Sequence, residues 1–81
     1  MGEKYTDQEL EDVLRRAFVD KGFKSVLYDG YVATQKPFVA AAIQHGLDKD
    51  LLCEGSPIEE EQYTAQIFIL TEEGKGYFGL S

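Results

Sequence analysis

The residues from Tyr63 to Thr71 predict a strand that the rest of the chain has to cover. Successive side chains of a strand point to opposite faces of its sheet. In this stretch one set of alternate side chains is apolar throughout, and the other becomes apolar toward its end; the two sets are Tyr63, Ala65, Ile67, Ile69 and Thr64, Gln66, Phe68, Leu70. We therefore expect a central strand, with other elements packed against its sheet.

The size of the chain predicts a single domain over residues 1–81. A chain of 81 residues buries only about 60% of its unfolded surface, which is enough for one core. Hydrophobic residues make up 43% of the chain and charged residues 28%, which is typical of a globular protein. We expect one folded unit, as a monomer or a small oligomer.

The cysteine content and the hydropathy favour a cytoplasmic protein. Cys53 is the only cysteine, so the chain cannot form an intramolecular disulfide. The longest apolar run, Phe38 to Ile43, is far too short to span a bilayer, and residues 1–20 lack the apolar core of a signal peptide. We expect a soluble chain in the reducing cytoplasm, with no membrane as a partner.

Two signals predict a helix over residues 7–21. Thr6 followed by Glu9 has the spacing of a capping box, in which each side chain bonds the backbone N–H of the other residue. Gly22 can adopt the left-handed backbone that ends a helix. Between these signals apolar side chains recur on one helical face, at Leu10, Val13, Leu14, Ala17 and Phe18.

Taken alone, residues 23–35 predict a β-hairpin. The segments 23–28 and 31–34 are rich in aromatic and β-branched residues, and they flank Asp29-Gly30, a dipeptide favoured in the tight turn of a β-hairpin. With a hairpin here the element order is α-β-β-α-β-β.

A second long helix is predicted from its cap at Thr34 to about His45, before Gly46. Pro37 falls in the first turn, where its missing backbone N–H leaves no hydrogen bond unmade. We expect the inward face to consist of Val39, Ala40, Ile43 and Leu47. The opposite face is unusually apolar for a solvent-exposed surface, and it carries Phe38, Ala41, Gln44 and His45. Either the rest of the fold covers this face or a partner does.

The net charge of −7 is concentrated in one segment of the chain. Between residues 48 and 63 the only base is Lys49, and the acids are Asp48, Asp50, Glu54, Glu59, Glu60 and Glu61. We expect residues 55–61 to form a loop that repels phosphate and attracts basic partners over about 8 Å. Gly74 and Gly76 then predict a turn, after which Tyr77, Phe78 and Leu80 fold back to be buried.

No group of residues indicates catalysis. His45 is the only histidine, whereas a metal site needs three or four converging ligands; its place near a helix C-terminus is explained by the helix dipole. Cys53 lacks the neighbours of an activated nucleophile, and Gly74-Lys75-Gly76 lacks the rest of a phosphate-binding loop. Residues 59–61 lack the alternating spacing of a calcium loop. We therefore expect no enzyme, no cofactor and no bound metal.

The order of these elements resembles the closing half of a winged-helix (winged helix-turn-helix) domain. The segments concerned are the helix before Leu51-Leu52, the acidic loop, and the strand that ends in Leu70-Thr71-Glu72-Glu73-Gly74-Lys75. The chain is similar to small winged-helix proteins of bacteria, phages and prophages, including accessory proteins of transcription. The resemblance implies an α+β fold, with helices packed on a short antiparallel sheet. Within residues 23–35 it implies a short strand followed by a short helix instead of the hairpin, so two interpretations of this segment stay open. It also implies a recognition helix at residues 35–47 and a wing at residues 54–62, which usually contact nucleic acid.

The residues at these positions are poorly suited to nucleic acid. Major-groove reading needs Arg, Asn or Gln aimed at base edges, and the helix offers only Lys36, Gln44 and His45 around its alanines. A wing contacts phosphates through Lys or Arg, and here it is acidic. We therefore expect a non-enzymatic interaction module that contacts a protein partner or a second copy of itself.

The candidate partner-binding residues are Phe38, Ala41, Gln44 and His45 on the helix and Glu59, Glu60 and Glu61 on the wing. One alternative function is a DNA-binding transcriptional regulator that uses Lys36, Gln44, Arg15 and Arg16. Another is an acidic inhibitor whose three consecutive glutamates imitate the phosphates of nucleic acid.

Overall fold

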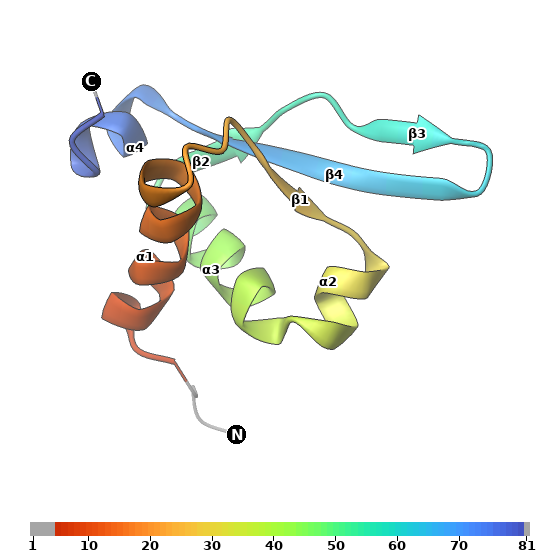
Figure 1. Cartoon of the computed structure of the whole chain (residues 1–81), viewed down its shortest axis with the longest axis horizontal. Coiled ribbons are helices and arrows are strands. Elements are labelled where there is room, and N and C mark those ends of the chain that lie inside the picture. Colours follow the sequence, from red (N-terminus) through yellow and green to blue (C-terminus); the bar gives the residue numbers. More distant parts are fainter. Residues whose placement is uncertain (1–4, 81) are drawn as a thin grey trace.

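The central strand expected from the sequence is present. In the computed structural model, which describes residues 5–80, β4 (Tyr63–Leu70) pairs antiparallel with β1 (Val26–Tyr28), β2 (Leu52–Glu54) and β3 (Ile58–Glu60). The order across the sheet is β1-β4-β2, while β3 pairs with the first residues of β4. As Figure 1 shows, β3 and β4 form a hairpin that extends past the helices.

Helices α1, α2 and α3 lie together on one side of this sheet (Figure 1). The first of them, α1 (Asp7–Arg15), begins at the expected capping box, in which Thr6 and Glu9 exchange hydrogen bonds of 2.9 and 3.1 Å. The helix continues through the π-helical segment η1 (Arg16–Asp20), and Gly22 follows with a φ angle of +68°. The helix expected over residues 7–21 is therefore confirmed for residues 7–20.

The hairpin considered for residues 23–35 is wrong, and so is the element order α-β-β-α-β-β. β1 ends at Tyr28, and α2 (Gly30–Gln35) follows it. The Oδ1 atom of Asp29 accepts a hydrogen bond of 2.9 Å from the N–H of Val32 and thereby caps α2. Aspartate favours both tight turns and helix N-termini, and at this position it starts a helix.

The second long helix is present as α3 (Pro37–Asp48), with Pro37 as its first residue. Two details of the prediction are wrong. Thr34 is not the cap, since it lies in α2 and its hydroxyl donates to the carbonyl of Gly30 at 2.9 Å. Gly46 does not end the helix but is buried within it, so close to β2 that an added Cβ atom would lie 2.6 Å from Cγ of Leu52.

The C-terminal part of the chain is more regular than the sequence indicated. Part of the expected acidic loop is strand β3, and the expected turn at Gly74 is helix α4 (Glu72–Tyr77). Thr71 caps α4 by accepting a hydrogen bond of 2.9 Å from the N–H of Gly74. A glycine is needed there because a side chain would collide with the carbonyl oxygen of Leu51. Phe78 is buried as expected, whereas Tyr77 and Leu80 remain largely exposed.

The core lies between the helices and the sheet. It draws on α1 and η1, on α3, on strands β2 and β4, and on the chain just after α4. Its buried members are Leu10, Leu14, Phe18, Ala42, Ile43, Leu51, Leu52, Phe68, Leu70 and Phe78. The result is a small α+β domain with helices packed on a short antiparallel sheet, as the sequence predicted.

Candidate functional site

The face of α3 that the sequence assigned to a partner is only partly exposed. Phe38 is 42% exposed and Gln44 is exposed, but Ala41 is half-buried and His45 is only 7% exposed. The fully buried residues of α3 are Ala42, Ile43, His45 and Gly46. Of these, only Ile43 belongs to the inward face expected from the sequence. The prediction that His45 faces outward is wrong, because α1 covers that side of α3.

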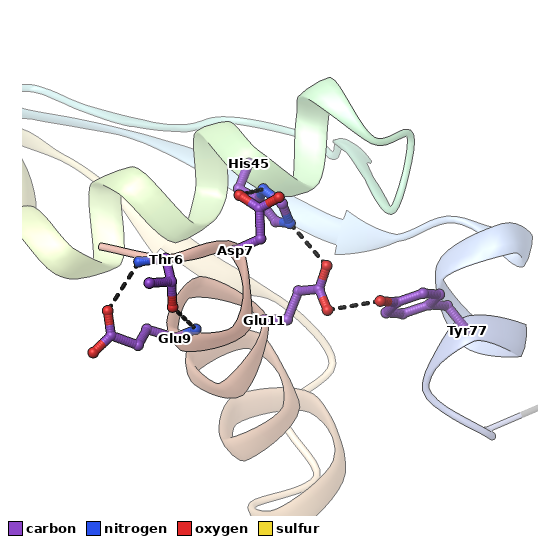
Figure 2. A network of polar contacts seen from close by, with 6 residues as sticks. All are labelled: Thr6, Asp7, Glu9, Glu11, His45 and Tyr77. Atoms are coloured by element: carbon purple, nitrogen blue, oxygen red, sulfur yellow. Dashed lines mark hydrogen bonds and ion pairs between the residues drawn. The ribbon is translucent and has the colours of Figure 1, made fainter. Parts of the chain in front are cut away.

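His45 contacts α1 instead of solvent. Its Nε2 atom lies 3.0 Å from Oε2 of Glu11, and its Nδ1 atom lies 3.8 Å from Oδ1 of Asp7, as Figure 2 shows. The other oxygen of Glu11 accepts a hydrogen bond of 2.6 Å from the hydroxyl of Tyr77 on α4. The Glu11 carboxylate therefore connects three helices, and this contact accounts for the burial of His45.

This arrangement keeps Glu11 ionised. The hydrogen bond from Tyr77 is the largest influence that lowers the pKa of Glu11 below its ordinary value of 4.5; partial burial opposes it, and His45 acts with it. The same hydrogen bond raises the pKa of Tyr77 above 10.0, because an ionised phenol would face the carboxylate. An ionised carboxylate only accepts hydrogen bonds, so Tyr77 and His45 both donate to Glu11.

The acidic residues of the expected wing lie on the β3–β4 hairpin. Glu59 and Glu60 belong to β3, Glu61 follows in the turn, and all three are exposed. Glu59 and Glu60 are consecutive in a strand, so their side chains leave opposite faces of the hairpin. Within residues 5–80 no three His, Cys, Asp or Glu side chains are close enough together to hold a metal ion.

The residues suggested for DNA contact are divided among three places. The guanidinium of Arg15 lies 5.3 Å from the centre of the Phe78 ring. Gln44 donates a hydrogen bond of 3.0 Å to Asp48 and lies beside His45, along a shallow depression on one flank of α3. Arg16 and Lys36 line a different surface, a groove on the other flank. The four side chains therefore do not form one surface.

That groove lies between α1 and the first half of α3, with β1 along its border, and its volume is about 470 Å³. Apolar side chains line most of it, among them Val13, Ala17, Phe23, Phe38 and Val39. Three exposed bases also line it, namely Arg16, Lys21 and Lys36. No Asp or Glu lines it among the residues that the structure describes. We call this surface the basic groove.

Only part of the basic groove has a signal in the sequence, and that part does not predict a groove. Val13 and Ala17 continue the apolar face of α1 beyond Leu10 and Leu14, and both remain half-buried in the fold. Which edge of that face stays uncovered depends on where α3 crosses it. Periodicity within one helix does not contain that information.

No helix in the described part of the chain is long and apolar enough to cross a lipid bilayer. Comparisons of the chain with protein-family models, with curated proteins and with solved structures find no match. The function is therefore argued from the surfaces themselves.

Proposed function

We propose that this chain is a non-enzymatic interaction module of the winged-helix type that contacts another protein. It acts as an accessory or regulatory component, of the kind that accompanies transcription in bacteria and phages. The observation that carries the proposal is Phe38, an aromatic side chain 42% exposed that lies at the start of α3 and lines the basic groove. Exposed aromatic rings provide large contact areas and are enriched at protein interfaces.

The charges around α3 support protein contact over DNA contact. Gln44, the α3 side chain best suited to reading a base, is paired with Asp48. The hairpin that corresponds to the wing carries three exposed glutamates where phosphate contacts require Lys or Arg. With a net charge of −7 the chain as a whole repels a polyanion.

A DNA-binding regulator is the second candidate, and one observation favours it. Arg16, Lys21 and Lys36 line the same groove and would present their charges to a phosphate backbone together. In this case affinity falls steeply with added salt. The logarithm of the binding constant then decreases with the logarithm of the salt concentration, with a slope of about −0.9 for each phosphate contacted. An acidic inhibitor that imitates nucleic acid would instead depend on Glu59, Glu60 and Glu61.

Variants that introduce or remove a negative charge distinguish these functions. The chain is used to capture proteins from a lysate of the cells that encode it, and captured proteins are purified and tested for direct binding. We expect Phe38→Glu to abolish binding and Leu80→Glu to preserve it. Leu80 is a matched control because it is apolar, 44% exposed and outside the basic groove. Binding that is lost only when residues 59–61 become glutamine identifies the acidic inhibitor.

A titration with a mixed-sequence DNA duplex at low salt tests the second candidate. We expect no change in the backbone chemical shifts of residues 36–48. Tight, salt-dependent binding with shifts at Arg16 and Lys36 contradicts the proposal and establishes a DNA-binding function.

A further inference from the structure

We propose that the basic groove binds an acidic segment of another protein, in which a large apolar side chain is flanked by Asp or Glu. This inference rests on the proposed function of protein contact, and it specifies the chemistry of the partner.

The apolar part of the groove defines the central contact. Two aromatic side chains that line it are exposed, Phe38 at 42% and Phe23 at 50%. They come from different parts of the fold, α3 and the segment before β1, and half-buried Val13, Ala17 and Val39 line the groove with them. A volume of about 470 Å³ lies within the range of about 300–1,000 Å³ that is typical of ligand pockets. An apolar side chain inserted here removes both aromatic rings from water.

The charges of the groove select the residues that flank this apolar side chain. Three of the eight Lys and Arg residues of the chain line it, and no acid does among residues 5–80. Lys21 is held near the aromatic lining, with its Nζ atom 5.8 Å from the centre of the Phe23 ring. Exposed charges act over about 8 Å in physiological salt, so the groove attracts acids even though the chain is acidic as a whole. The same three positive charges repel a basic segment.

A second copy of this chain fits the groove less well than another protein does. Its β3–β4 hairpin has the required acids, and docking the hairpin into the groove would join two different surfaces. Such a head-to-tail contact produces open chains or rings instead of a closed dimer. The large aromatic residue of that hairpin, Tyr63, also has its hydroxyl bonded to Asp29.

The test starts from a displayed library of random peptides selected for binding to the whole chain. We expect the selected peptides to be rich in Asp and Glu and to contain Phe, Leu or Trp. A synthetic peptide of this kind should shift the backbone resonances of residues 13–17, 23–27 and 36–43. Its affinity should fall when salt is raised, because charges on the rim of a groove are screened.

Single substitutions assign the contacts. Phe38→Ala should weaken the peptide at least about fivefold, as expected for a central aromatic contact. Arg16→Gln and Lys36→Gln should each weaken it about twofold to fivefold at low salt. Lys49→Gln is the matched control, since it removes an exposed positive charge outside the groove and should leave the affinity unchanged. If Phe38→Ala fails to fold, Arg16→Gln and Lys36→Gln still show whether the peptide binds in the basic groove.

Several outcomes overturn the inference. If the selected peptides lack acids, or if their affinity is unchanged by Arg16→Gln and Lys36→Gln, the bases of the groove do not select an acidic partner. Peptides that bind the acidic hairpin overturn the groove as the docking site but leave the protein-contact function intact. A DNA duplex that shifts the groove resonances when no peptide does overturns both the inference and the proposed function. The selection of no peptide also overturns the inference, because the groove then has no affinity for the stated chemistry.

Discussion

Tyr63, the first residue of β4, donates a hydrogen bond of 2.7 Å from its hydroxyl to Oδ2 of Asp29, the N-cap of α2. The other oxygen of the same carboxylate accepts from the N–H of Val32 at 2.9 Å. One side chain therefore starts α2 and also attaches it to the turn end of the β3–β4 hairpin, where Tyr63 pairs with Glu60. The two contacts lower the pKa of Asp29 below 3.8, with the backbone hydrogen bond of Val32 as the larger cause.

Substitutions at Asp29 should separate these two contacts. Asp29→Ala removes both and should lower the free energy of unfolding more than Asp29→Asn, because asparagine also caps helices well. Tyr63→Phe removes only the hydroxyl contact and should have the smallest effect. Urea unfolding of the three variants measures the order. A loss for Asp29→Ala no larger than that for Tyr63→Phe would mean that the cap does not stabilise α2.

Gly46→Ala should destabilise the chain even though alanine favours a helix. A Cβ atom at this position would lie 2.6 and 2.7 Å from two carbon atoms of Leu52. Overpacking of this kind lowers the free energy of unfolding by about 1–3 kcal/mol. Gly76→Ala is the control, because nothing lies within 4 Å of a Cβ atom there; it should be neutral or stabilising by up to about 1 kcal/mol. Both are measured by urea unfolding.

The contact between Gly46 and Leu52 also predicts coupling between the two positions. Leu52→Ala shortens the side chain that a Cβ at position 46 would meet. The cost of Gly46→Ala should therefore be smaller in a Leu52→Ala background than in the wild type. Equal costs in both backgrounds would show that the close approach to Leu52 is not the cause.

Stability should fall at acidic pH in a way that depends on Glu11. The pKa of Glu11 is lower in the folded state than its ordinary value of 4.5. Its ionisation therefore contributes stability that is fully present above pH 4.5 and is lost as the pH falls through the lower folded-state pKa. Glu11→Gln should flatten the dependence of unfolding free energy on pH in this window. An unchanged pH profile would contradict this role for Glu11.

Stability should also fall at alkaline pH through two tyrosines. The hydrogen bond to Asp29 raises the pKa of Tyr63, and the hydrogen bond to Glu11 raises the pKa of Tyr77, each from an ordinary value of 10.0. The contribution of each neutral phenol is fully present below pH 10.0 and is lost as the pH rises through the raised pKa. In an absorbance titration, Tyr63→Phe and Tyr77→Phe should each remove one ionisation above pH 10.0. Removal of an earlier ionisation would contradict the corresponding hydrogen bond.

Elements with strong local signals were predicted correctly. The capping box at Thr6 and Glu9, the proline at the start of α3 and the alternation along β4 each identify an element without reference to the rest of the chain. Residues 23–35 stay open between a hairpin and a strand with a helix, because the residues around Asp29-Gly30 favour the hairpin whereas the resemblance to winged-helix domains implies the helix. The choice between them follows from contacts that the local sequence does not contain, including the hydroxyl of Tyr63.

The exposed face of α3 was partly misassigned for a different reason. Residues 38–43 are all apolar, so the first turns of this helix show little contrast between one side and another. The faces of the helix then differ little in how apolar they are, and the packing of α1 decides which one is buried. The sequence places His45 on the surface because its partners, Glu11 and Asp7, are 34 and 38 residues away along the chain.

The sequence by itself determined the α+β class, the positions of α1, α3 and β4, and the acidic segment, because caps, periodicity and charge are local properties of the chain. Only the tertiary structure decided that His45 is buried, that the three glutamates of residues 59–61 do not share a face, and that Arg16, Lys21 and Lys36 border one apolar groove. The physical reason is that a groove consists of what the packing of separate elements leaves uncovered. That depends on how α1, β1 and α3 meet, which no single segment specifies.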